Sequence, residues 1–241
     1  MISRPAAPPA TTHAQDRAIL AVIGAAALIL TATQFVETPE PPGPGASGAQ
    51  IRLFIEANLD RTVLAVMAST IGFGALLLVT VGLWRLVATR RQGQSFAAIM
   101  LLISGNLSAL WLGLAAAVDL IPVVAADDAG KLEAYSDQTL LTLDLVQRLN
   151  ETFGDVWTVP RGFFLISAGL LIVRHRMLPR WTGLLALVVG AASLLGILSI
   201  SLKGGIAIAW LVGLFGFVLW TLVLGVTSLV LVLLRSARSR H

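Results

Sequence analysis

Four charged side chains fall inside or at the edge of long apolar segments, where a charge is costly and able to support chemistry. Arg161 lies thirteen residues before Arg174, so a helical rise of about 1.5 Å per residue puts it roughly 20 Å from the basic end of its segment. The same count puts Asp119 and Lys203 about 33 to 36 Å from the basic ends of theirs, the far boundary of a hydrocarbon core about 30 Å thick. With Asp155, these residues are predicted to share one layer.

Arg161 is the deepest of these charges. An arginine at this depth must reach the interface with its long side chain, pair with a carboxylate, or face a wet cavity. One hypothesis is an outward-open polar pocket in which Arg161 binds an anion or lipid headgroup, with Asp119 or Asp155 as its partner and Lys203 in the same layer. The other is structural: Arg161 reaches the interface or forms a static ion pair that locks two helices together.

Polar uncharged residues are expected near the middle of three apolar segments, at Asn106, Ser193 and Thr221. Such groups commonly form hydrogen bonds between membrane helices, worth about 1 kcal/mol or less each; a contact with a ligand is the alternative role for Asn106. Small residues at four-residue steps predict close helix approach, at Gly205, Ala209 and Gly213 and at Ala186 and Gly190.

Several kinds of site are missing from the sequence. It has no cysteine, and its three histidines lie in a terminal tail, a basic turn and the last position. Thiolate, heme and intramembrane metal sites are therefore not expected. No HExxH, GxSxG or phosphate-loop motif occurs. We predict no cofactor and no metal, and the net charge of +4 comes from Lys and Arg beside apolar runs, which suits lipid headgroups and not nucleic acid.

The elements that would position these residues are membrane helices. Hydrophobic residues make up 56% of the 241 residues and charged residues 12%, far from the roughly 25% charged residues of soluble domains. We expect an all-α integral membrane protein. Its six transmembrane helices are predicted at about 18–36, 62–84, 96–118, 155–173, 181–201 and 206–234, in a domain of residues 17–235 between a disordered cytoplasmic tail (1–16) and a short one (236–241).

Charge asymmetry gives the expected orientation. Asp16 is the one acid in the segments assigned to the inner side, and the other twelve acids fall on the outer side. Short loops rich in arginine stay inside, so both termini are predicted to be cytoplasmic, in the plasma (inner) membrane. The inner segments hold eleven of the seventeen basic residues: Arg4, Arg17, Arg85, Arg90, Arg91, Arg174, Arg176, Arg180, Arg235, Arg238 and Arg240.

Two outer segments have helical amphipathic patterns. Ile51, Phe54, Ile55 and Leu59 predict an interfacial helix before the second span. The segment 125–154 is predicted to form an outer cap. On its helix the charged residues Asp137, Asp144, Arg148, Glu151 and Asp155 lie on one face, and Leu141, Leu145, Val146, Leu149 and Phe153 lie on the other.

The stretch FGDVWTVPRGFFLISAGLLIVRHRMLPRWTGLLALVVGAASLLG, residues Phe153 to Gly196, has an LPRW turn between two expected spans. It resembles the second half of a family of uncharacterised bacterial six-helix membrane proteins, common in actinobacteria and known only as a domain of unknown function. The resemblance implies a six-helix architecture and brings no activity with it.

Three functions are compatible with these residues. The leading hypothesis is a non-catalytic accessory, sensory or assembly protein that binds a protein partner at its outer face, or a lipid or other apolar ligand. The alternative is a small intramembrane enzyme acting on a prenyl or lipid substrate, with Asp119 or Asp155 as the acid and Arg161 holding an anionic group. The third hypothesis is a transporter.

Overall fold

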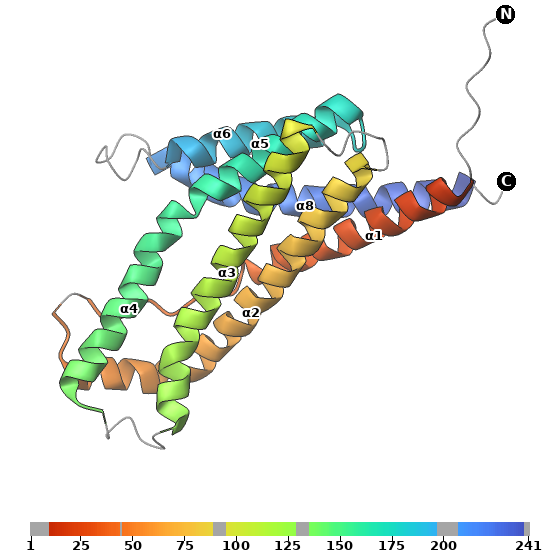
Figure 1. Ribbon diagram of the computed structural model, residues 1–241. Helices are drawn as coiled ribbons and strands as arrows, with labels where there is room; N and C mark the ends of the chain where they lie inside the picture. The colour runs from red at the N-terminus through yellow and green to blue at the C-terminus, as the bar shows by residue number, and fades with distance from the viewer. Residues whose placement is uncertain (1–9, 44, 89–94, 129–134, 197–206, 239–241) are drawn as a thin grey trace, which may run out of the picture.

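The computed structural model describes residues 10–43, 45–88, 95–128, 135–196 and 207–238, and every regular element in these ranges is an α-helix (Figure 1). Four helices are long and apolar enough to cross a membrane, along Ala14–Thr33, Gly48–Ala88, Phe96–Ala126 and Ile208–Ala237. The expected all-α membrane class is confirmed at this level. The described helices are α1 (Ala10–Thr33), α2 (Gly48–Ala88), α3 (Phe96–Asp128), α4 (Asp137–Val156), α5 (Thr158–His175), α6 (Arg180–Gly196) and α8 (Ala207–Arg238).

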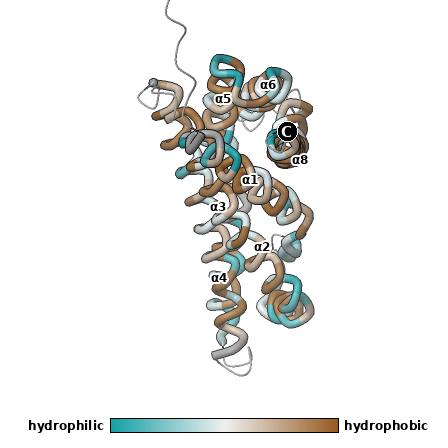
Figure 2. The backbone as a smooth tube through the Cα atoms, turned by 90° about the vertical axis from the view of Figure 1, so that its right-hand side faces the viewer, coloured by the Kyte–Doolittle hydropathy of each residue, from teal (hydrophilic) through white to brown (hydrophobic). Residues whose placement is uncertain are grey.

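Six helices form a closed ring. Each packs on the next in the order α1, α2, α3, α5, α6, α8, and α8 packs back on α1. Large side chains fill the middle of the ring, with Phe164, Phe217 and Trp220 almost fully buried. Every helix of the ring has exposed apolar residues, as expected for surfaces that meet lipid. Figure 2 shows hydrophobic residues along the backbone of these helices.

Glycine pairs bring neighbouring helices of the ring into backbone contact. On α5 and α6, Gly162 faces Gly190 and Gly169 faces Gly183; a Cβ added at Gly169 would lie 2.7 Å from the carbonyl oxygen of Gly183. The close approach expected at Gly190 is therefore confirmed. Gly213 of α8 likewise meets the backbone of α6 at Ser193; the predicted Gly205 lies outside the described residues.

Three helices are longer than expected at their ends. α8 continues to Arg238, past its expected end at residue 234 and into the segment expected as a tail. α1 begins at Ala10 and not after residue 16, because Ala10–Asp16 contains no Gly or Pro to stop a helix. α3 continues past Asp119 and through Pro122 to Asp128. A proline removes one backbone hydrogen bond and bends a helix without having to end it.

The predicted boundaries also change around two junctions. The expected interfacial helix and second span form one helix of 41 residues, α2. The expected fourth span is divided at Trp157, between α4 and α5. Pro160 explains this break, because it lacks the N–H that a continuous helix would need and is tolerated within the first turn of α5.

Basic and acidic residues lie at opposite ends of the helices. In Figure 1 the start of α1 and the end of α8 lie at the right, and the end of α2, the start of α3 and the α5–α6 turn lie at the upper middle to upper right. The basic residues Arg85, Arg174, Arg176, Arg180 and Arg235 lie in or beside these ends. The acidic segments after α1 and at the start of α4 lie on the opposite side.

α4 packs outside the ring, on α2 and α3. Residues 48–60 of α2, residues 117–128 of α3 and α4 together form what we call the distal extension, at the lower left of Figure 1. Its small core consists of Ile51, Ile55 and Leu140. Arg52 links α2 to the segment just before α4, because its Nη2 donates a 3.2 Å hydrogen bond to the carbonyl oxygen of Tyr135.

Candidate functional site

Arg161 lies inside the ring, in the first turn of α5, between two aromatic rings. Its guanidinium carbon is 4.4 Å from the ring centroid of Trp157, one turn earlier, and 5.5 Å from that of Phe217 on α8. These rings meet edge to face at 5.9 Å. The indole N–H of Trp157 donates a 3.0 Å hydrogen bond to the carbonyl oxygen of Ser108, which fixes the ring against α3.

The Arg161 side chain is 1% exposed, so it does not reach the interface and does not line an open pocket. Within the described part of the chain it forms no ion pair, and its Nε has no hydrogen-bond partner. The negative faces of the two rings provide the nearby compensation for its charge, at about 2 kcal/mol or more for a desolvated cation. In the described residues Arg161 thus occupies a closed cation–π site, and neither an open pocket nor an ion pair with Asp119 is seen there.

Asp119 lies in a different place. It is 7% exposed and lines a cavity of about 200 Å³ beneath the segment after α1, with Ser69 of α2 and Gln147 of α4. Asp155 belongs to α4, but its side chain lies outside the described residues, as does the whole of Lys203. Of the four predicted residues, Arg161 and Asp119 are the two whose side chains are described, and they lie in separate sites.

The uncharged polar residues divide between the interior and the surface. Thr221 of α8 is buried, and its hydroxyl accepts a 2.9 Å hydrogen bond from Thr31 of α1, so its predicted role between helices is confirmed. Ser193 is buried at the α6–α8 contact, but its Oγ has no hydrogen-bond partner in the described residues, so the predicted bond between helices is not found there. Asn106 is exposed on α3, and its Nδ2 donates a 2.7 Å hydrogen bond to the carbonyl oxygen of Leu102 in the same helix.

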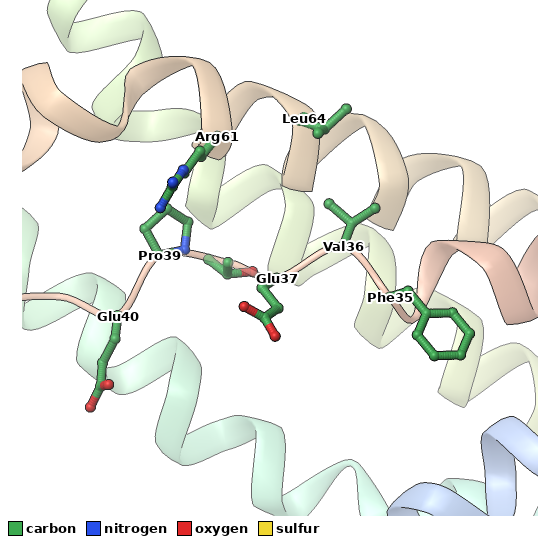
Figure 3. A pocket seen from close by; sticks show the side chains of 8 residues that line it. Phe35, Val36, Glu37, Pro39, Glu40, Arg61 and Leu64 are labelled. Carbon is green, nitrogen blue, oxygen red and sulfur yellow. The ribbon is translucent and has the colours of Figure 1, made fainter.

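An open pocket of about 770 Å³, which sequence reasoning did not single out, lies between the segment 35–40 and α2. Figure 3 shows Arg61 of α2 reaching toward Pro39, while the carboxylates of Glu37 and Glu40 point away from α2. Arg61 makes no ion pair with either acid in the described structure. The proline-rich composition of this segment and the nearby basic residue were the available signals, but neither indicated that the segment folds back over α2.

α4 presents its two faces in an unexpected way. Asp144 is buried toward α2 and α3 and accepts hydrogen bonds from Arg148, at 2.7 Å to Nε and 3.4 Å to Nη2. Leu141, Leu145 and Leu149 are 46%, 56% and 46% exposed on the other side of the helix. A simple cap would bury the leucines and expose the charged pair, so the structure reverses that arrangement.

A further groove, of about 390 Å³, runs between α3 and α5 on the outside of the ring. Its walls are almost entirely apolar, which suits a hydrocarbon chain better than a polar substrate. The lining residues are Met100, Ile103, Ser104, Leu107, Leu110, Trp111, Leu114, Val159, Pro160 and Phe163.

No protein-family model, curated protein or solved structure matches the chain. By its fold the chain is an all-α protein with several helices able to cross a membrane. Two regions of the described structure stand out. One is the closed site around Arg161, and the other is the distal extension, where leucines are exposed on α4.

Proposed function

We propose that this chain is a six-span protein of the plasma (inner) membrane with both termini in the cytoplasm. We further propose that it is a non-catalytic accessory, sensory or assembly protein that binds a protein partner through α4. Membrane lipid is the expected neighbour of the ring.

Six spans are supported by the order of the ring. α5 and α6 are short, but each has neighbours on both sides within the ring, so they share the environment of the four longer spans. The arginine-rich ends on one side of the molecule require an even number of crossings and suit the cytoplasmic side. The 18 residues of α5 include Arg161, Arg174 and His175, which lowers its mean hydropathy.

The observation that carries the partner-binding proposal is the row of exposed leucines on α4. Leu141, Leu145 and Leu149 follow at four-residue steps, the spacing by which amphipathic helices enter a groove on another protein. Contiguous exposed apolar surface commonly marks an interaction site. The inner face of α4 is already occupied by α2 and α3, so this row is free to meet a partner.

Helix length supports a position of α4 beyond the hydrocarbon core. α2 has 41 residues and α3 has 33, lengths of about 60 and 50 Å, whereas the core is about 30 Å thick. Counting from their arginine-rich ends, the surplus lies in the distal extension, on which α4 packs. Lipid would then not cover the leucines, and a protein partner would.

The absence of native cysteine makes the test direct. We expect L145C in proteoliposomes to react with a membrane-impermeant maleimide, and to be protected in native membranes where a partner is present. L222C, an exposed position on α8 within the ring, serves as the lipid-covered control. If L145C in proteoliposomes is as unreactive as L222C, lipid covers α4 and the proposal fails.

A photo-crosslinker beside α4 identifies the partner and tests its dependence on the leucines. We expect the crosslinked product to disappear in L145E and to persist in L53E, which changes another exposed leucine of the distal extension. Loss of the product in both variants, or in neither, would contradict a site on the leucine row.

The geometry favours binding over catalysis. The alternative of an intramembrane enzyme requires Asp119 or Asp155 to meet Arg161 at one substrate. Asp119 lines a separate cavity, Arg161 is enclosed by Trp157 and Phe217, and the side chain of Asp155 lies outside the described residues. No described feature favours the transporter hypothesis, which flux measurements in proteoliposomes would test.

A further inference from the structure

Asn106 is the one polar residue on the exposed surface of α3 between Phe96 and Ala126, in the part of α3 whose side chains are described. It lies eleven residues after Ser95, so in the proposed orientation it is about 16 Å into a core about 30 Å thick, close to the midplane. A lipid-facing amide at this depth has no hydrogen-bonding group in the surrounding hydrocarbon.

Among the described residues, the amide of Asn106 is only partly satisfied. One N–H donates to the carbonyl oxygen of Leu102, and an asparagine amide has a second N–H and a carbonyl oxygen with two lone pairs. Leaving such groups unpaired in an apolar environment is costly. Polar residues in membrane helices usually meet this need by bonding to another helix, and here the neighbouring helices of the same chain lie on the other side of α3.

Asn106 lies within a regular row of exposed residues. The row advances by steps of four, three, four and seven residues along α3, so Ile103, Leu110 and Ala117 are seven residues apart, as in the heptad repeat of packed helix pairs. A single asparagine in such a repeat sets the register and the number of helices. The residues are Ile99, Ile103, Asn106, Leu110 and Ala117, all exposed.

We propose that the Asn106 row of α3 is the contact surface for a second copy of this chain, giving a dimer with two parallel α3 helices. Hydrogen-bond complementarity favours this partner, because the amide has a donor and an acceptor and thus complements its own image across a twofold axis. Two copies inserted in the same orientation also place their Asn106 residues at the same depth. α8, opposite α3 in the ring, would face away from the contact.

The inference rests on the proposed insertion of α3 in the bilayer but needs no partner at α4. Resistance of the protein to alkaline extraction from membranes tests insertion separately. A negative result in the dimer experiment therefore leaves the proposed function of α4 standing, and loss of the α4 partner leaves the dimer standing.

The test uses the full chain in proteoliposomes over a range of protein-to-lipid ratios. With Asn106 intact, we expect I103C and L110C to form disulfide-linked dimers under mild oxidation, while L222C on α8 stays monomeric at the same dilution. If I103C and L110C crosslink no more than L222C, the proposal is overturned. A crosslink of I103C to a different protein in native membranes, with no dimer in proteoliposomes, also overturns it.

The contribution of the Asn106 amide is tested by measuring the dimerisation equilibrium, through energy transfer between labelled copies of the chain. We expect N106V to weaken dimerisation by about tenfold, the effect of one to two interhelical hydrogen bonds, and N106Q to weaken it less because it keeps the amide. Equal dimerisation of N106V and the unchanged chain would overturn the role of Asn106. Because position 106 faces outward, neither variant disturbs the packing inside the ring.

Discussion

The interior of the ring and the distal extension differ in where they place charged and apolar side chains. In the ring, the cation of Arg161 is enclosed by Trp157 and Phe217 and is 1% exposed. In the distal extension, Asp144 and Arg148 pair on the inner face of α4, and leucines are left outside. In this chain the charge deep in an apolar segment is buried and closed to a ligand, whereas the leucines on the amphipathic helix α4 are accessible at the surface.

The helices of the ring and α4 also differ in how they pack against their neighbours. α5 and α6 are held by backbone contact at glycine pairs, which leaves no space for a ligand between them. α4 is held by the small core around Leu140, and its one ion pair, between Asp144 and Arg148, lies within the helix itself. We expect the ring to unfold as a unit and α4 to open locally, because few buried apolar contacts fix α4.

The largest effect is expected for Trp157→Ala in the ring. The change creates a cavity, removes the face over the Arg161 guanidinium and leaves the Ser108 carbonyl without its indole donor. We expect a loss of about 3–5 kcal/mol in the free energy of unfolding, measured by denaturant titration in detergent micelles. Trp181→Ala, at an exposed position of α6, is the matched control and should change the stability little.

The orientation of α4 is tested by two leucines five residues apart. Leu140→Ala should destabilise the distal extension by about 2–5 kcal/mol because its side chain is buried in the small core. Leu145→Ala should have an effect within about 0.5 kcal/mol because its side chain is exposed. Hydrogen exchange of the α4 amides measures both, and similar protection in the two variants would mean that the helix is turned differently.

The tightness of the ring is tested at its glycines. Gly169→Ala places a methyl group against the Gly183 carbonyl, and we expect a loss of about 1–3 kcal/mol as α5 and α6 separate. Gly74→Ala on α2 is the control, since a Cβ there meets nothing within 4 Å; it should be neutral or add up to about 1 kcal/mol through helix propensity. Equal effects at the two positions would show that α5 and α6 are not in backbone contact.

The smallest effect in the ring is expected for Arg161→Met, which nearly keeps the volume and removes the charge. Since Arg161 has no ion pair in the described structure, we expect a change below about 1.5 kcal/mol in the free energy of unfolding. A loss of about 3–5 kcal/mol would instead reveal a buried carboxylate partner. Arg85→Met, at an exposed position beside Trp84, is the control for a lost positive charge.

Local pattern was enough to predict much of the fold. Long uncharged runs indicated the membrane class and the first three spans, because burial in lipid imposes a minimum length of apolar helix. Four-residue steps of small residues predicted the close contact at Gly190, since only small side chains let backbones approach. The α4–α5 break was missed although Pro160 was its signal, because an apolar run alone does not show where a helix bends.

The sequence by itself determined composition, helix periodicity and the distribution of charge along the chain, which are properties of neighbouring residues. Only the tertiary structure decided which side of each helix is covered. It placed Arg161 under Trp157 and Phe217, left Asn106 on the outside of α3, and turned the leucines of α4 away from the chain. The physical reason is that an amphipathic pattern defines two faces of a helix, whereas contacts between residues far apart in sequence determine what each face meets.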